Sequence, residues 1–121
     1  MASILTVDDS ASIRQAIKIA LGGEGHTVTE AADGSLGLAK AAAGGFNLII
    51  TDLNMPVMDG LTMIRQLRTK PAGAGVPILF LTTESDAGVK AEAKAAGATG
   101  WLTKPFDAEQ LVRIVKKVLA T

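Results

Sequence analysis

Acidic side chains follow two short apolar runs of the sequence. Asp8 and Asp9 come directly after one run, and Asp52 comes directly after another. The hydroxyl of Thr82 ends a third run, and the ammonium group of Lys104 follows a fourth. Carboxylates gathered at one place repel one another unless a cation lies among them, and oxygen ligands of this kind suit Mg²⁺. With a lysine and a hydroxyl donor added, the set is suited to magnesium-assisted phosphoryl transfer to an aspartate nucleophile.

Such a site needs a scaffold that brings separate segments together. Short continuous apolar runs alternate along the chain with segments of helical period, which is typical of repeated strand–helix units. We expect strands in segments 3–7, 26–30, 47–51, 77–82 and 99–103. Continuous apolarity predicts that the first, third and fourth are buried on both faces, and the other two are expected at the edges.

Apolar residues between the expected strands fall on helical stripes. The stripes are Ile13, Ile17, Ala20 and Leu21; Leu61, Ile64 and Leu67; and Leu111, Ile114, Val115, Val118 and Leu119. Segments 35–43 and 86–96 are alanine-rich, and Gly44 and Gly97 stand where a left-handed residue would end each helix. Right-handed crossovers between parallel strands place all carboxyl ends at one edge, where ligands bind. The sequence thus predicts an α/β fold, a doubly wound (βα)5 parallel sheet, with the polar residues converging.

Composition narrows the possible functions. The 121 residues correspond to one domain, so a single unit over residues 1–121 is expected, without a second effector domain. Twelve Lys plus Arg balance twelve Asp plus Glu, which argues against binding to nucleic acid or to a membrane surface. Cysteine is absent, the first residues do not form a signal peptide, and no apolar run approaches ~20 residues. A cytoplasmic, monomeric protein is expected.

Each polar residue also has a structural interpretation. An aspartate at the end of a strand is most often a helix N-cap or a turn residue. Thr82 taken alone is an ordinary β-branched strand residue, and Lys104 taken alone is an ordinary surface charge. Arg14, which follows the aspartate pair, could approach the site, but a role on a helix surface is expected. The prediction of a site therefore depends on the combination, because four expected strands out of five end in a group suited to a cation or an oxyanion.

Four motifs carry a resemblance to a known family. They are "VDDS" (7–10), "DLNMPVMDG" (52–60), "LTTE" (81–84) and "TKPF" (103–106). In this order and spacing they resemble the receiver domain of two-component response regulators, over essentially the entire chain, and most of all the stand-alone CheY-like receivers of chemotaxis. The resemblance implies a flavodoxin-like fold with the strand order 2-1-3-4-5 that is established for CheY.

The resemblance also implies a metal-dependent phosphorylation site. Asp52 would accept a phosphoryl group from a phosphohistidine of a histidine kinase. Asp9 and Asp52 would bind Mg²⁺ directly, together with the backbone carbonyl of Asn54, and Asp8 would act largely through water. The family is not a class of enzymes in the usual sense, since the chain would catalyse only its own phosphorylation and dephosphorylation.

Further roles follow from the same resemblance. Thr82 would donate to one phosphoryl oxygen and Lys104 would pair with another, with the bond to Pro105 in the cis form. Pro56 and Gly60 would shape the loop behind the acceptor.

Two positions would set the lifetime of the signal, and one would transmit it. Asn54 and Glu84 stand where side chains influence hydrolysis of the acyl phosphate, which implies a short-lived signal. Trp101 would couple to Thr82 as the aromatic residue of the switch, although receivers mostly have Tyr or Phe there. The alternative for Trp101 is a half-exposed aromatic residue on an edge strand without a switching role.

Several functions remain to be compared. A chemotaxis receiver would take phosphate from a CheA-like kinase, bind a flagellar motor switch protein or another target, and serve as substrate for a phosphatase. A phosphorelay intermediate or phosphate sink of another system would share the same site. A haloacid-dehalogenase-like phosphatase would need a second aspartate where this chain has Asn54. A flavodoxin-type electron carrier is disfavoured because Asp8 and Asp9 would repel the FMN phosphate.

Overall fold

A parallel sheet forms the centre of the structure, a computed structural model that describes residues 2–83 and 87–120. Its strands are β1 (Ser3–Val7), β2 (Thr27–Ala31), β3 (Leu48–Asp52), β4 (Ile78–Thr82) and β5 (Gly100–Thr103). They pair in the order β2-β1-β3-β4-β5, and every pair is parallel. The predicted doubly wound, flavodoxin-like α/β fold and its 2-1-3-4-5 order are confirmed, with β2 and β5 at the edges.

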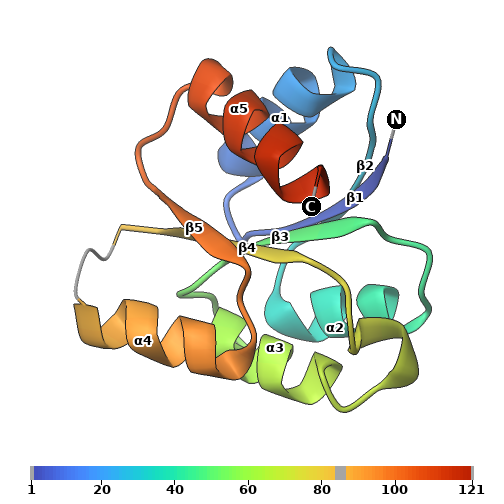
Figure 1. Cartoon of the computed structure of the whole chain (residues 1–121), viewed down its shortest axis with the longest axis vertical. Helices are drawn as coiled ribbons and strands as arrows, with labels where there is room; N and C mark the ends of the chain where they lie inside the picture. The colour runs from blue at the N-terminus through green and yellow to red at the C-terminus, as the bar shows by residue number, and fades with distance from the viewer. Residues whose placement is uncertain (1, 84–86, 121) are drawn as a thin grey trace.

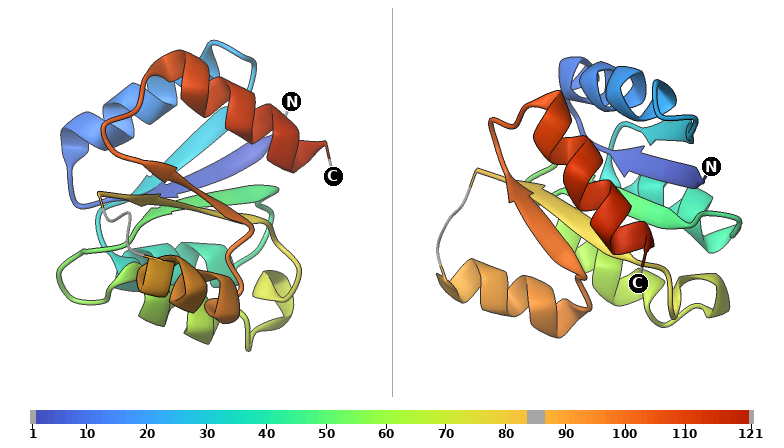
Figure 2. Two further views of the ribbon diagram at one scale, coloured as in Figure 1. Left: turned by 60° about the vertical axis from the view of Figure 1, so that its left-hand side comes forward. Right: turned by 45° about the horizontal axis from the view of Figure 1, so that its top comes forward.

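Helices cover both faces of this sheet. They are α1 (Ala11–Gly22), α2 (Gly34–Ala42), α3 (Gly60–Leu67), α4 (Ala87–Ala96) and α5 (Ala108–Leu119). Figure 1 shows α1 and α5 on one face and α2, α3 and α4 on the other, and the two turned views agree (Figure 2). A short 3-10 helix, η1 (Pro71–Gly73), lies between α3 and β4.

Two apolar cores lie on the two faces of the sheet. One holds Ile4, Leu48 and Ile50 against α1 and α5, and the other holds Ile49 and Phe80 against the remaining helices. All residues of β3 and β4 are buried, as their continuous apolarity predicts. Complete burial of a Leu or Ile side chain stabilises the fold by about 1.5–3 kcal/mol, so these central strands anchor the edge where the polar residues lie.

Strand limits differ by one residue from the sequence prediction at several ends. The ladder of β4 begins after Pro77, because proline has no N–H to donate. Asn47 precedes β3 and holds the start of β1, since its side-chain oxygen accepts from the Ser3 N–H at 2.8 Å. At the other end of the strand, Asp52 is the last residue of β3 and pairs in register with Leu81, which fixes its backbone.

Glycines end two helices as predicted. Gly44 follows α2 with a φ of 85°, and Gly97 follows α4 with a φ of 108°. Residues other than glycine prefer a negative φ and would be strained at both places. Helix α5 begins with a capping box formed by Asp107 and Gln110.

Candidate functional site

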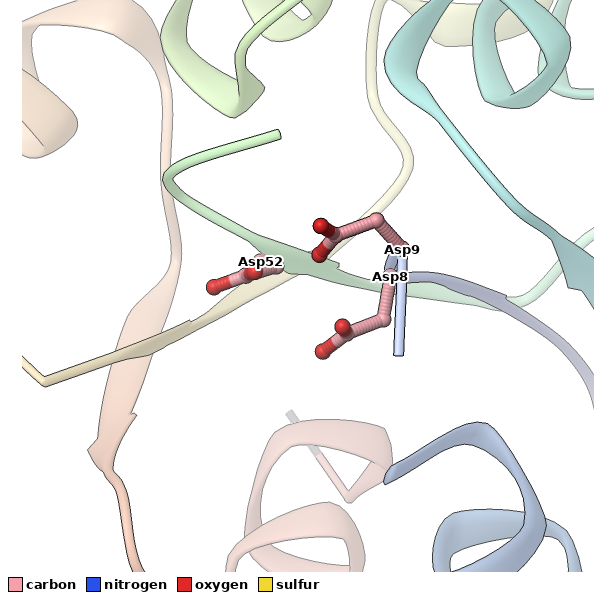
Figure 3. Close-up of side chains that lie close together, drawn as sticks. All are labelled: Asp8, Asp9 and Asp52. Atoms are coloured by element: carbon pink, nitrogen blue, oxygen red, sulfur yellow. The ribbon is translucent and has the colours of Figure 1, made fainter. Parts of the chain in front are cut away.

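Three carboxylates meet at the carboxyl edge of the sheet. Oxygen atoms of Asp8, Asp9 and Asp52 all lie within 4.8 Å of one another. Figure 3 shows the side chains extending from the neighbouring ends of β1 and β3 into a common space. Asp8 is fully buried, Asp52 is 8% exposed, and Asp9 faces solvent. The convergence predicted from the sequence is therefore present.

Lys104 bridges two of these carboxylates. Its Nζ atom lies 3.0 Å from Oδ2 of Asp8 and 3.1 Å from Oδ1 of Asp52. The backbone places the lysine there, because the Lys104 N–H donates to the Thr82 carbonyl at 2.8 Å, just beyond the paired ends of β4 and β5. The Lys104–Pro105 peptide bond is cis. Thr82 itself is 4% exposed and ends β4, beside Asp52 at the end of β3.

None of the three aspartates is a helix N-cap. Helix α1 is capped by the Ser10 hydroxyl, which accepts from the Ile13 N–H at 3.3 Å. The N-cap of α3 is Asp59, which accepts from the Thr62 N–H at 2.7 Å. Helix capping thus does not account for this cluster, although Asp8 also acts as a turn residue by accepting from the Ser10 N–H.

Backbone amides orient the two buried carboxylates. Oδ1 of Asp8 accepts from the Ser10 N–H at 2.9 Å, and Oδ1 of Asp52 accepts from the Leu53 N–H at 2.9 Å. Each carboxylate is therefore held by one amide and by Lys104. In Asp8 the two contacts hold different oxygens and so orient the whole carboxylate, whereas in Asp52 both contacts hold Oδ1.

Electrostatics in the cluster favour a cation. Burial raises the pKa of Asp52, and the neighbouring Asp8 raises it further, while the Lys104 ammonium group offsets only part of the increase. Burial alone would lower the pKa of Lys104, but contacts with Asp8 and Asp52 outweigh it, so the pKa is raised. The neighbouring carboxylates contribute to both increases, so negative charge is in excess in this desolvated place, and a bound cation would relieve it.

The loop after β3 is held close to the carboxyl end of that strand. A Cβ atom on Gly60 would lie 2.3 Å from the Asp52 carbonyl oxygen, so only glycine fits there without a shift. The Met58 N–H donates to the Pro56 carbonyl at 2.8 Å, which closes a tight three-residue turn. At its centre Val57 has a φ of 71° and is 82% exposed. Positive φ is rare for a β-branched residue, so this turn is strained.

For Arg14 the structure favours the alternative, an approach to the site, over the expected role on a helix surface. Instead of a plain surface role, its Nη1 atom donates to the Asp8 carbonyl at 2.6 Å and its Nε atom pairs with Glu30 at 3.2 Å. Arg14 thereby ties the acidic end of β1 to the edge strand β2. Its spacing from Asp8, in the first turn of a helix after a strand end, was the available signal.

The remaining predicted residues are Asn54, Glu84 and Trp101. Asn54 follows β3 and is exposed. Glu84 lies outside the described residues. Trp101 is half-buried and pairs in register with Phe80, so it shares a sheet face with Thr82, two residues further along β4. A small hollow has both Thr82 and Trp101 in its walls.

Comparison with families of known proteins identifies this arrangement. The model of the response regulator receiver domain matches residues 4–116. The chain belongs to this family. Receiver domains are phospho-accepting signalling units that bind Mg²⁺ at an acidic site, and histidine kinases and downstream targets are their partners. Membership of the family sets aside the phosphatase and electron-carrier alternatives.

Several relatives resemble the receiver over nearly its whole length. Chemotaxis protein CheY of Pseudomonas aeruginosa (strain PAO1) is 37% identical over 116 residues, which are 95% of this chain and 94% of that protein. The structure of Vibrio cholerae chemotaxis protein CheY4 is 47% identical with a TM-score of 0.93, and 98% of each chain is covered. The receiver is thus CheY-like in sequence and structure.

A further similar structure contains a metal. It is the receiver domain of sensor histidine kinase PA1611 from Pseudomonas aeruginosa PAO1, with a magnesium ion coordinated in the active-site cleft. It is 31% identical, has a TM-score of 0.91, and the match covers 99% of this chain and 98% of that one.

By contrast, the chain spans about half the length of the transcriptional regulatory proteins that it also matches. No helix in the described part of the receiver is both long and apolar enough to cross a membrane.

Proposed function

We propose that this receiver is a phospho-switch in which Asp52 accepts a phosphoryl group from a histidine kinase. The observation that carries the proposal is the setting of the Asp52 carboxylate. It is nearly buried at a strand end, 3.1 Å from a lysine and within 4.8 Å of two further carboxylates. A carboxylate held in this way is a nucleophile with the charges for phosphoryl transfer already arranged around it.

The transfer can be written from the contacts of Asp52. Because Leu53 N–H and Lys104 Nζ both hold Oδ1, we assign Oδ2 as the attacking oxygen. Oδ2 forms a bond to phosphorus, the bond from phosphorus to the imidazole nitrogen breaks, and that nitrogen keeps the electron pair. Lys104 offsets negative charge on the transferred group, and we assign the Thr82 hydroxyl as donor to another phosphoryl oxygen.

The donor set at the site fits Mg²⁺. Three carboxylates with oxygen atoms this close suit a hard cation that keeps some of its water, and exposed Asp9 leaves the site open to solvent. We assign Asp9 and Asp52 as direct ligands with the carbonyl of Asn54, and Asp8 as a ligand of bound water. Bound Mg²⁺ supplies charge stabilisation for the phosphoryl oxygens. The magnesium ion in the active-site cleft of the similar PA1611 receiver supports the presence of a Mg²⁺ site here.

The remaining predicted residues are assigned to control and output. Thr82 and Trp101 form the switch, and their shared hollow supports this pairing. The side chains at Asn54 and Glu84 are proposed to set the rate at which the acyl phosphate hydrolyses. Exposure of Asn54 at the rim is consistent with contact to attacking water.

For the biological role we propose a stand-alone chemotaxis receiver over residues 1–121. It would be phosphorylated in the cytoplasm by a CheA-like kinase and would bind a flagellar motor switch protein. Similarity to two chemotaxis proteins over nearly their full length supports this role. The second candidate is a phosphorelay intermediate or phosphate sink, because the same fold also occurs in the PA1611 sensor kinase. A pull-down with beryllofluoride-bound receiver distinguishes the two roles. A chemotaxis receiver should capture a motor protein, and a phosphorelay intermediate or phosphate sink should capture a phosphotransfer protein.

The phospho-acceptor function is tested with a small phosphodonor. The receiver is incubated with acetyl phosphate and Mg²⁺, and the emission of Trp101, the sole tryptophan, is followed. We expect a change in emission that requires Mg²⁺ and is absent from Asp52→Asn. An equal response in Asp52→Asn would overturn the assignment of Asp52.

A further inference from the structure

The indole ring of Trp101 has a cation above it. The Nζ atom of Lys90, on α4, lies 5.1 Å from the centroid of the ring. An ammonium group within about 6 Å of a ring centroid is attracted to the negative face of the ring. The contact joins α4 to the edge strand β5, and both side chains are half-buried. Lys90 is therefore more than a solvated charge on a helix surface.

The same lysine lines the hollow between Thr82 and Trp101. The walls of this hollow are formed by Leu53, Phe80, Thr82, Val89, Lys90, Ala93 and Trp101. Phe80 pairs with Trp101, and Thr82 lies on the same face of β4, so the hollow runs along one side of the sheet from the ring towards the hydroxyl. The hollow has a volume of only about 10 Å³, so the ring could turn into it only if Thr82 moved, and such a turn would carry the ring face away from the Lys90 ammonium group.

We propose that Lys90 is a positioning residue that holds Trp101 in its resting rotamer and so opposes movement of the ring towards Thr82. The inference rests on the proposed phospho-switch, because phosphorylation at Asp52 is what would draw Thr82 inward. The contact is present in this structure, and a turn of the ring towards Thr82 would break it, so it favours the arrangement seen here over the turned one. Indole is also the aromatic ring to which a cation binds best, which gives the unusual tryptophan at this position a purpose.

The expected size of the effect on the switching equilibrium follows from the nature of the contact. At a half-exposed site, loss of one cation–π contact changes an equilibrium by about two- to fivefold. Lys90→Met keeps the length and apolar contacts of the side chain but removes the charge. Lys90→Arg keeps a cation that can lie over the ring. Lys94→Met is the matched control, because it removes the same charge from an exposed position one turn later on α4.

The resting contact is tested first, by NMR without any phosphoryl mimic. Protons above an aromatic ring are shifted upfield, so the ε-methylene protons of Lys90 should be shifted relative to those of Lys94. The shift should disappear in Trp101→Leu. If the Lys90 protons were unshifted in the parent protein, the contact would not exist in solution and the proposal would fail.

The effect on the switch is tested by titrating beryllofluoride in the presence of Mg²⁺ and following Trp101 emission. Lys90→Met should reach the active emission at about two- to fivefold lower mimic concentration, whereas Lys90→Arg and Lys94→Met should follow the parent. A midpoint for Lys90→Met equal to the parent, or an equal shift in Lys94→Met, would overturn the role of Lys90. A parent protein that did not respond to the mimic at all would instead count against the phospho-switch, and the proposed role of Lys90 would then fail as well.

Discussion

Replacement of Lys104 by methionine should destabilise the receiver strongly when no divalent cation is present. At an effective dielectric constant of about 20, an ammonium group 3.0 Å from Asp8 and 3.1 Å from Asp52 gains roughly 5 kcal/mol of gross attraction to each. Desolvation of the three charges cancels most of this gain. Removal of one partner from a buried pair typically costs about 3–5 kcal/mol, and since the Lys104 side chain is 16% exposed we expect the lower end.

The assay is thermal unfolding followed by circular dichroism in EDTA near neutral pH. For a domain of this size, a loss of about 3 kcal/mol lowers the unfolding midpoint by roughly 10 °C. The matched control is Lys116→Met, whose Nζ atom lies 3.3 Å from Glu24 but whose side chain is 67% exposed. An exposed pair of this kind contributes about 0–1 kcal/mol, so the control should stay close to the parent.

Two further conditions sharpen the same experiment. Mg²⁺ should recover much of the lost stability in Lys104→Met, because the cation replaces the missing charge among the carboxylates. The raised pKa of Lys104 means that its contribution is complete below the ordinary lysine pKa and is lost as pH rises through the raised value. If Lys104→Met unfolded in EDTA within the error of Lys116→Met, Lys104 would not be the counter-charge of this cluster.

Three other substitutions give independent predictions. Asp52→Asn should be more stable than the parent in EDTA at neutral pH, because the raised pKa of Asp52 makes its ionisation costly in the folded state; the advantage should shrink as pH falls through that pKa, and melts that show a growing advantage in acid would contradict it. Val57→Asn should raise the free energy of unfolding in urea by about 1 kcal/mol, because asparagine tolerates the positive φ better, and an unchanged midpoint would show that the turn is not strained. Gly60→Ala should lower the free energy of unfolding by about 3 kcal/mol through its clash with the Asp52 carbonyl, whereas Gly75→Ala, with open space around it, should change it little; equal effects would refute the close approach.

The sequence predicts the fold because its apolar pattern changes period at nearly every element. The continuous runs predicted in 47–51 and 77–82 are expected to be buried on both sides, and the parallel sheet then brings the polar residues at their ends together. Strand order did not follow from the pattern; it came from the resemblance carried by the motifs around Asp52 and Lys104. The structure agrees with the predicted fold and with the predicted strand order.

Contacts between side chains that are distant in the sequence could not be predicted from it. Nothing in a single sequence shows that Lys90 lies over Trp101, because the distance depends on how α4 packs beside β5. Likewise, Arg14 reaches the Asp8 carbonyl only because α1 begins directly after the end of β1. The positive φ of Val57 is also hidden, since valine is a residue that rarely adopts it.

The most direct test of the central claim is the site of phosphorylation. The receiver is treated with acetyl phosphate and Mg²⁺, the acyl phosphate is reduced with borohydride, and the modified residue is identified by peptide mass spectrometry. The account predicts modification at Asp52 alone, with none at Asp8 or Asp9 and none without Mg²⁺. Modification at another residue, or an acyl phosphate that still forms in Asp52→Asn, would contradict it.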